Sequence, residues 1–333
     1  MSKCSAGLEI TEGRPQGLPL YHPGLADVEK RLMEMAGSLY GLPAELASFI
    51  IASGGKRIRP ILALHSSDFA ECDHELAVDV ATSVELVHMA SIVHDDVIDQ
   101  AMSRRGRETI NARWGNHLAV LTGDLLLSKA LEILSRRRKY GVVRVLANTV
   151  ANMSQAEMIQ ASRAFDERMT EAEYTDYVSK KTAYLMAASC YSGAATSRAG
   201  RKRMACMWEY GLYLGIAFQI IDDTLDIVGD ETMIGKPTGK DLACGVMTLP
   251  IIRGLQHPVA GPALREIMRS RRTGAETLSK VHHLLLESGA IAYSYAQARK
   301  YVEFAKAKLQ SMPDCSARDC LLALAELVIT RNA

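Results

Sequence analysis

Apolar residues recur along this chain at the three- and four-residue spacing of one helix face. The spacing is clear in two stretches, Leu118–Leu126 and Ile216–Ile221. The alternation of apolar and polar residues that marks a half-buried strand does not persist anywhere in the sequence. The pattern therefore predicts an all-α fold.

The prolines indicate where the long helices should lie. All ten stand outside the interval 61–236, at positions 15, 19, 23, 43, 60, 237, 250, 258, 262 and 313. Because a proline inside a helix breaks it, such a long interval without proline suits long helices. Residues 1–22 are rich in Gly, Pro, Ser and Glu and show no period, so we expect a flexible N-terminal leader. Residues 23–333 are expected to form one domain.

The charged residues are nearly balanced, with 39 Lys and Arg against 38 Asp and Glu in 333 residues. This balance gives no overall field that favours nucleic acid or an anionic membrane, so neither is an expected partner. The longest apolar runs, 183–195 and 211–218, are shorter than the roughly 18 to 20 residues that a bilayer span needs. We therefore expect a soluble, cytoplasmic protein without stable membrane insertion.

One short acidic pattern occurs twice. It reads Asp-Asp-x-x-Asp and covers Asp95–Asp99 and Asp222–Asp226. On a helix, the first and last aspartate of each motif stand one turn apart on one face, where like charges repel. Each motif follows an apolar stretch, so the carboxylates are expected to line a cavity that holds a cation. A single motif would more often be solvated surface, but a matching pair weakens that alternative.

Ligands that are all oxygen favour Mg²⁺, which binds a few carboxylates, keeps several waters and often bridges to phosphates. Basic side chains lie where a diphosphate would need them, since Arg offers a planar fork and Lys a point charge. They occur in four segments: GGKRIRP at 54–60, RRG at 104–106, KKT at 180–182 and GKP at 235–237. Each segment alone is a weak signal, and it is their order with the acidic motifs that favours a diphosphate site.

From about Gly24 to Arg331 the chain resembles the trans-type polyprenyl diphosphate synthases. The resemblance is carried by motifs in one order: GGKRIRP, HDDVID followed by RRG, GD at 123–124, KT, FQIIDDTLD, GKPTGKDL and TLP. It implies a single-domain bundle in which long helices surround one deep cavity. The two aspartate motifs would face each other across the mouth of that cavity.

The resemblance also implies a role for each matched side chain. About three Mg²⁺ ions would be held, directly or through water, by Asp95, Asp96, Asp99, Asp222 and Asp226. The diphosphate of an allylic primer would be bound by Arg104, Lys181, Thr182, Gln219 and Lys236. The first two of these, Arg104 and Lys181, would also assist its departure. Isopentenyl diphosphate would bind a purely cationic site formed by Lys56, Arg59, His88 and Arg105.

Four further side chains carry less specific expectations. His88 taken alone would more often be a satisfied core histidine, but the surrounding VELVHMAS match favours the binding role. Asp223 would support the metal site from behind its ligands, and Asp241 could reach a metal through water. His94 would form part of the wall of the metal site.

The implied reaction joins farnesyl or geranylgeranyl diphosphate to successive isopentenyl diphosphates, giving an all-trans polyprenyl diphosphate. Ionisation of the primer is the step that the cations would assist. Ala90 and Ser91, which precede the first motif, are small where short-chain enzymes of this family carry bulky aromatics. We therefore expect a product of roughly six to eight isoprene units, a quinone side-chain precursor, whose release could involve peripheral contact with the membrane. Both residues could instead merely allow close helix packing.

Other classes stay open at this point. A terpene cyclase or a head-to-head prenyl synthase would share the aspartate motifs but would not need GGKRIRP with Arg105, and a silent partner subunit would not need to keep every matched residue. A short-chain geranylgeranyl synthase is a further alternative. The segments 84–99 and 308–331 look most like the larger, catalytic subunit of two-component hexaprenyl or heptaprenyl synthases, which need a small helical partner. The alternative is a homodimer of the long-chain branch.

Overall fold

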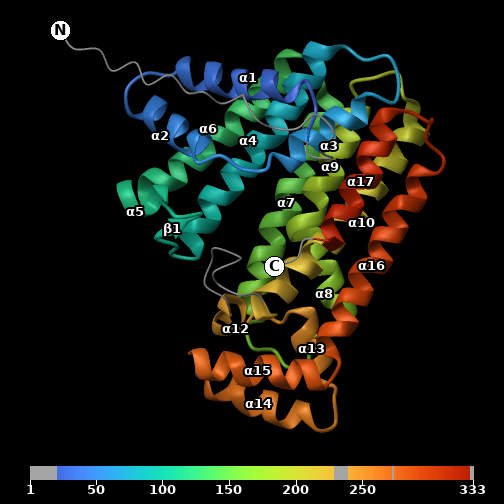
Figure 1. Ribbon diagram of the computed structural model, residues 1–333. Helices are drawn as coiled ribbons and strands as arrows, with labels where there is room; N and C mark the ends of the chain where they lie inside the picture. The colour runs from blue at the N-terminus through green and yellow to red at the C-terminus, as the bar shows by residue number, and fades with distance from the viewer. Residues whose placement is uncertain (1–20, 229–238, 272–273, 331–333) are drawn as a thin grey trace.

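The computed structural model describes residues 21–228, 239–271 and 274–330, and these form the helical body drawn in Figure 1. The first part contains α1 (Leu25–Gly37), α2 (Leu42–Ala52), α3 (Ile58–Ser67), α4 (His74–Ile98), β1 (Ser103–Arg104), β2 (Arg107–Glu108), α5 (Ile110–Trp114), α6 (Asn116–Arg136) and α7 (Tyr140–Ser162). The second part contains α8 (Glu171–Val178), the π-helical turn η1 (Ser179–Ala183), α9 (Tyr184–Ala194), α10 (Gly200–Val228), α12 (Lys240–Cys244), α13 (Leu249–Leu255), α14 (Ala260–Ser270), α15 (Ala275–Glu287), α16 (Ala290–Leu309) and α17 (Ser316–Thr330). The prediction of an all-α fold is confirmed.

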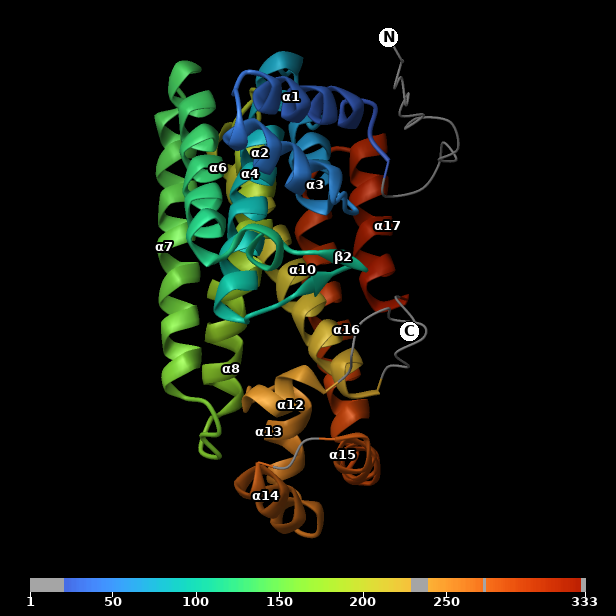
Figure 2. The same ribbon diagram turned by 90° about the vertical axis from the view of Figure 1, so that its left-hand side faces the viewer.

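The long helices α4, α6, α7, α10 and α16 run along the length of the molecule. Figure 2 shows α1 crossing one end of this bundle, while α14 and α15 close the other end. The core divides into two large clusters, one built around α4 with α1, α6 and α7, the other around α10 with α9, α13 and α16. The two helices that carry the aspartate motifs therefore lie at the centres of the two halves of the core.

Helix α4 begins at a side-chain cap and is buried over most of its length. The carboxylate of Asp73 accepts a hydrogen bond from the backbone N–H of Leu76 at 3.2 Å, which satisfies one of the free donors at the helix start. Neighbouring helices α1, α3, α6 and α9 pack around it. Because α4 is covered on most sides, its sequence is apolar over most of its surface, and the buried hydroxyls of Thr82 and Ser83 donate to carbonyls of the same helix.

By length and composition alone, α4 and α10 could cross a membrane, although their uninterrupted apolar runs are short. In α4, 83% of the apolar window is buried inside the protein, and in α10 the share is 50%. A buried core helix passes the same test, so these two helices are weak evidence for a membrane protein. The expected cytoplasmic location stays a prediction, and nothing in the described residues supports peripheral attachment to a membrane.

Two glycines let helices approach more closely than any side chain would permit. A Cβ atom at Gly193 of α9 would lie 1.9 Å from the carbonyl oxygen of Ala63 in α3, and one at Gly215 of α10 would lie 2.5 Å from the Cα of Ala183. Contacts this short are impossible, so these positions require glycine. The second contact sets η1, and with it the Lys-Thr motif, directly against α10.

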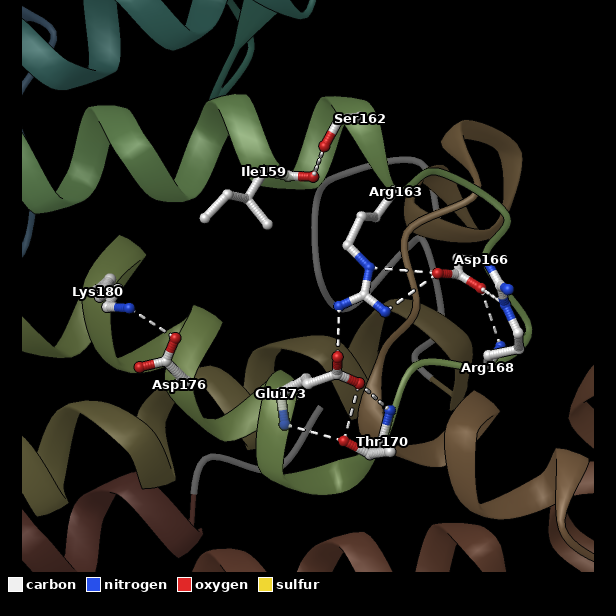
Figure 3. A network of polar contacts seen from close by, with 9 residues as sticks. All are labelled: Ile159, Ser162, Arg163, Asp166, Arg168, Thr170, Glu173, Asp176 and Lys180. Atoms are coloured by element: carbon white, nitrogen blue, oxygen red, sulfur yellow. Dashed lines mark hydrogen bonds and ion pairs between the residues drawn. The ribbon is translucent and has the colours of Figure 1, made fainter.

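The connection between α7 and α8 is fixed by a local polar network, shown in Figure 3. Thr170 and Glu173 form a reciprocal capping box at the start of α8. Arg163, at the end of α7, donates to Glu173 at 2.8 Å and to Asp166 at 3.0 Å. The network holds the start of α8 against the end of α7, so that the following turn, η1, packs against α7.

A two-stranded hairpin interrupts the helical body after α4. Its register pairs Ser103 with Glu108 and Arg104 with Arg107. The two turn residues, Arg105 and Gly106, have positive φ values of 53° and 74°, as in the type I′ turn that matches the twist of a hairpin. The sequence RRG thus forms the end of β1 and the tip of the hairpin.

The segment that precedes α1 is fixed by hydrogen bonds of His22. His22 is buried, and its Nδ1 accepts a hydrogen bond from the backbone N–H of Gly24 at 3.0 Å. A neutral His22 therefore carries its proton on Nε2, which donates to Asp68 at 2.9 Å. The ring of His65 packs edge-on against that of His22. Because both ring nitrogens of His22 already form hydrogen bonds, we interpret His22, His65 and Asp68 as a structural group and not as a metal site. The expected leader falls mostly on residues 1–20, outside the described residues.

Candidate active site

The first aspartate motif lies at the C-terminal end of α4. The backbone N–H of Asp99 bonds to the carbonyl of Asp95 at 2.8 Å, which keeps the two residues one turn apart. Asp96 is buried, and its Oδ1 accepts from Nε of Arg104 at 2.8 Å. The C-terminal end of a helix carries partial negative charge, so three carboxylates placed there are unfavourable without a cation.

The second motif lies near the C-terminal end of α10, and its three aspartates differ in environment. Asp223 is buried, with one oxygen accepting from Tyr174 at 2.5 Å and the other from Gln219 at 2.6 Å. Burial raises the pKa of Asp223 to about 7, although these two donors oppose the rise. Asp222 is exposed and Asp226 is half-buried. Since protein donors satisfy both oxygens of Asp223, it fits the supporting role expected for it.

The short helix α12 brings the two motifs together. Nζ of Lys240 lies 2.5 Å from Oδ2 of Asp99, and the backbone N–H of the next residue, Asp241, donates to Asp226 at 3.1 Å. One turn of chain therefore contacts both motifs, which face each other as expected. Lys240, for which the sequence indicated no role, supplies a cation to the first motif.

The carboxylates of both motifs are held in conditions that oppose their ionisation. Burial raises the pKa of Asp95 to about 6, and the charges of Glu157 and Asp99 add to the rise. Burial and the charge of Asp222 likewise raise the pKa of Asp226. Carboxylates crowded in this way gain most from a bound cation, and a donor set made only of oxygens fits Mg²⁺.

Lys181 stands between the two motifs on η1. Its Nζ lies 2.7 Å from Oε1 of Glu157 and 2.8 Å from Oε1 of Gln160, both on α7. Burial acts to lower the pKa of Lys181, but Tyr177 and Glu157 outweigh it and hold the pKa above its usual value. The adjacent Thr182 donates to Oε1 of Gln219 at 2.7 Å. The Lys-Thr motif is thereby linked to α7 on one side and to the second aspartate motif on the other.

Sequence reasoning missed Glu157 and Gln160. Glu157 is the only charged residue between Arg144 and Arg163, on a helix that is otherwise polar or apolar. A lone charge in such a stretch was the available signal, but its partner Lys181 lies 24 positions away in the sequence, on another element.

The cationic site forms where the loop before α3 meets α4 and the hairpin. Nη1 of Arg105 donates to the carbonyl of Gly54 at 2.8 Å. A Cβ atom on the next glycine, Gly55, would lie 2.9 Å from the same nitrogen, and its φ of 157° disfavours other residues. Lys56 follows at the exposed end of this loop. The glycine pair lets the loop and the hairpin tip lie in contact.

Arg59 and His88 complete the cationic site and define its protonation. Nη1 of Arg59 lies 2.9 Å from Nε2 of His88. Because arginine only donates, this nitrogen of His88 accepts, and the ring is neutral with its proton on Nδ1. Burial, reinforced by Arg59 and Arg105, holds the pKa of His88 well below its usual value. Burial also lowers the pKa of Arg59, to about 10, which leaves it charged at neutral pH.

Arg57, the remaining basic residue of GGKRIRP, faces away from this site. It is 5% exposed and binds Glu29 of α1 at 2.7 Å and Glu85 of α4 at 2.9 Å. Its φ of 50° places it in the left-handed region at the start of α3, between Lys56 and Arg59. Arg57 is thus a buried side chain that fixes the loop through two ion pairs. Its partners, Glu29 and Glu85, were not predicted from the sequence.

A cavity of about 120 Å³ opens beside the cationic site, between α3, α9, α10 and α17. It is lined by Lys56, Ile58, Met186, Leu214, Phe218, Leu324, Leu327 and Val328. Along α4, exposure increases from buried Val84 through half-buried His88, Ser91 and Asp95 to exposed Asp99. None of the cavity's lining residues comes from α4, so neither Ala90 nor Ser91, the residues expected to affect product length, borders this cavity.

The sequence also assigned roles to Ala90, Ser91, His94 and Lys236. Ala90 is buried in the α4–α6 cluster, and the hydroxyl of Ser91 donates to the carbonyl of His88 at 2.8 Å. His94 points at α6, where a Cβ atom on Gly123 would lie 2.2 Å from its Nε2, so it packs against the Gly-Asp motif. Lys236 lies outside the described residues.

Comparison with known proteins agrees with this arrangement. Residues 42–285 match the Polyprenyl synthetase family. Component 2 of the heptaprenyl diphosphate synthase of Bacillus subtilis (strain 168) is 36% identical over 305 residues, covering 92% of this chain and 87% of the relative. Relatives named as octaprenyl, solanesyl and geranylgeranyl diphosphate synthases match as well.

Two crystal structures show the same fold. The heptaprenyl diphosphate synthase of Staphylococcus aureus has a TM-score of 0.86 at 31% identity, covering 93% of this chain and 98% of that one. A polyprenyl synthase of Caulobacter crescentus CB15, complexed with calcium and isoprenyl diphosphate, has a TM-score of 0.87 at 30% identity, covering 93% and 95%. The protein described here therefore belongs to the polyprenyl synthetase family and is a trans-polyprenyl diphosphate synthase.

Proposed function

We propose that this chain condenses farnesyl or geranylgeranyl diphosphate with successive molecules of isopentenyl diphosphate, in a Mg²⁺-dependent reaction that gives a long-chain polyprenyl diphosphate. One observation supports two diphosphate sites above all. Adjacent hairpin residues reach into both halves of the site, Arg104 to Asp96 at 2.8 Å and Arg105 to Gly54 at 2.8 Å. A terpene cyclase, which uses one diphosphate substrate, has no use for the second, cationic half.

The acidic half would hold about three Mg²⁺ ions through Asp95, Asp96, Asp99, Asp222 and Asp226. When bound, the metal supplies positive charge that stabilises a departing diphosphate. The raised pKa of Asp95, caused by burial and then by Glu157 and Asp99, is the property of this site that supports a cation there.

The protein's own side chains would do the rest of the work on the primer. Arg104, Lys181, Thr182 and Gln219, with Lys236, would bind the allylic diphosphate. As its C–O bond breaks, Arg104 and Lys181 stabilise the oxygens that gain charge, because both are already held beside the motifs. The apolar clusters around α4 and α10 would exclude water from the allylic cation, which water would otherwise capture.

The second substrate would be held by charge alone. Lys56, Arg59 and Arg105, with neutral His88, would bind isopentenyl diphosphate next to the first motif. Its double bond attacks the allylic carbon to form the new C–C bond, and the proton lost from C2 would pass to the released diphosphate.

Product length is proposed to depend on Ala90 and Ser91, which would leave the path of the growing chain open. We propose a quinone side-chain precursor of roughly six to eight isoprene units. Relatives named as heptaprenyl and octaprenyl diphosphate synthases support this length, whereas one named as a geranylgeranyl diphosphate synthase supports a shorter product. Substitution of Ser91 by Phe, with or without Tyr at Ala90, tests this role. A blocked path gives shorter products with turnover retained, whereas a packing role gives a less stable protein with unchanged products.

A partner is proposed on the face formed by α6 and α7, which lie side by side at one edge of the bundle in Figure 2. Val120, Leu121, Met158 and Ile159 are exposed there. The exposed face of α7 carries no charge from 147 to 155. An uncharged face with exposed apolar side chains suits a permanent partner, either a second copy or a small helical subunit. The mass of the purified chain in solution distinguishes the two.

The test of the proposed function is direct. The purified chain, alone and with any small protein that purifies with it, is incubated with each primer and labelled isopentenyl diphosphate, with and without a chelator. We expect chelator-sensitive formation of polyprenyl diphosphates, measured by chromatography after removal of the diphosphate. Turnover that resists the chelator would refute the metal role, and no turnover in either preparation would refute the activity.

A further inference from the structure

Glu85 is a buried carboxylate with one oxygen in use. Its side chain on α4 is 4% exposed, and Oε1 accepts from Nη1 of Arg57 at 2.9 Å. Oε2 is buried and has no hydrogen-bond partner in the described protein. Leaving a charged oxygen in this state is costly, so such an atom calls for an explanation.

A complementary atom lies on the neighbouring arginine. Nε of Arg59 is also buried and lacks a protein partner among the described residues. Burial lowers the pKa of Arg59, and Glu85 is the main charge that opposes this shift, ahead of Asp95. Glu85 and His88 lie one turn apart on α4 and bond to Arg57 and Arg59, so the unsatisfied acceptor and the unsatisfied donor belong to neighbouring side chains. One buried water bonded to both atoms would satisfy both.

We propose that Glu85 is a positioning residue for the isopentenyl diphosphate site, acting on Arg59 through Oε2 while Oε1 holds Arg57. The proposal rests on the function assigned above to Arg59. Nη1 is bonded to His88, and a water-mediated bond from Nε to Glu85 would fix the guanidinium at a second point. Its remaining N–H groups are then presented in one orientation to a diphosphate, which lowers the entropy lost on binding.

Charge alone gives the opposite expectation, which makes the idea testable. A buried negative charge next to a cationic site repels an incoming anion, so its removal should tighten diphosphate binding. If Glu85 instead orients Arg59, its removal should weaken binding. The sign of the change separates the two roles.

The experiment measures binding of inorganic diphosphate by calorimetry, in the presence of a chelator so that the aspartate motifs hold no metal. Glu85→Gln keeps the shape of the side chain and removes its charge. We expect its Kd to rise about tenfold, the usual size of one lost charge-assisted hydrogen bond. An unchanged or lower Kd would overturn the proposal. Should this variant not fold, Glu85→Asp, which moves the oxygens while keeping the charge, is expected to weaken binding in the same way, and an unchanged Kd would overturn the proposal equally.

Glu29→Gln is the matched control. Glu29 also binds Arg57, at 2.7 Å, but it is not among the charges that act on Arg59. We expect this variant to change the diphosphate Kd by less than about twofold. If both glutamine variants weaken binding equally, the effect passes through Arg57 and the loop. Glu85 would then not act by positioning Arg59.

A double-mutant cycle separates this inference from the proposed function. In an Arg59→Ala background, Glu85→Gln should cause no further loss, because its target is gone. If Arg59→Ala itself leaves binding intact, the site assignment has failed and the proposal falls with it. If Arg59→Ala weakens binding but Glu85→Gln does not, only the positioning role has failed. With turnover, Glu85→Gln should raise the KM for isopentenyl diphosphate and leave that for the primer unchanged.

Discussion

One hairpin connects the aspartate motifs with the cationic site. The two groups of like charges differ in how much of their repulsion is offset by partners inside the protein. Around the motifs, Asp95 and Asp226 are half-buried among other carboxylates, and their partial burial and this repulsion raise the pKa of each. In the cationic cluster, Arg59 bonds to a neutral histidine, and the buried Arg57 beside it is neutralised by two glutamates.

This difference indicates how far each half is prepared before substrate arrives. The cationic half has internal partners that hold its side chains in place, so it resembles a preformed anion site. The acidic half has carboxylates in excess of their partners, so under the proposed function it would be completed by bound cations.

The largest effect is expected from Asp95→Ala. Removing this carboxylate should lower kcat by several orders of magnitude, because it takes away a metal ligand from the half that depends on metal. The fold should persist, since Asp95 is half-buried and contributes charge repulsion more than packing. Steady-state kinetics and circular dichroism check the two parts. Activity near the parent level would show that the acidic half has been misassigned.

A smaller and more selective effect is expected from Lys56→Ala. Lys56 lies on the exposed loop at the edge of the cationic half. Loss of one charged phosphate contact should raise the KM for isopentenyl diphosphate about tenfold, with the KM for the primer unchanged. Kinetics with each substrate varied in turn measure this split. Equal damage to both substrates would contradict two separate sites.

The two halves also differ in how far the sequence alone predicts them. The acidic half consists of repeated motifs at the ends of two helices, so the spacing of the aspartates is enough to predict that their carboxylates cluster, while their role as metal ligands stays a prediction. That the motifs meet through Lys240, and that Lys181 pairs with Glu157, depends on how distant elements pack.

In the cationic half, Lys56, Arg57 and Arg59 are near neighbours in one motif, and only two of them face the site. The left-handed conformation of Arg57 and its glutamates, each 28 positions away, turn it inward. Local pattern contains neither fact. The hairpin is a similar case, because two-residue strands are too short to show alternation, although RRG fits a turn with two positive φ values.

A modest effect on stability should sharpen the contrast. The pKa of Asp95 rises from 3.8 to about 6 in the folded protein, with burial as the main cause. Between these values the folded state keeps a proton that the unfolded chain has lost, so the stability of the metal-free protein falls as the pH rises. Above about pH 6 the full penalty applies. Asp95→Asn removes it and should raise the Tm of the chelated protein by about 1 to 3 °C at pH 7.5, a range reduced for partial solvent exposure.

This gain in Tm should shrink towards zero as the pH is lowered to about 4, where the folded protein holds Asp95 protonated and the unfolded chain is close to doing so. It should also disappear when Mg²⁺ and diphosphate are added, because these stabilise only the parent. Differential scanning calorimetry across this pH range is the measurement. A lower Tm for the variant at pH 7.5 would mean that the acidic half is not strained in the absence of metal.

The smallest effect is expected from His88→Gln, because His88 of the cationic half is already neutral before substrate binds. Burial and the charges of Arg59 and Arg105 keep the pKa of His88 well below its usual value, so His88 stays neutral from about pH 6 to 8. His88→Gln replaces one neutral acceptor by another, and it should raise the KM for isopentenyl diphosphate by a few-fold at most. The ratio of variant to parent KM should then be the same at every pH in this range, because the ionisation of the substrate affects both proteins equally. A charged His88 would instead assist the parent in acid, and the ratio would climb below about pH 6.5. Such a climb would show that His88 gains a proton in this pH range, and that the protonation state of the cationic half is not fixed before substrate binds.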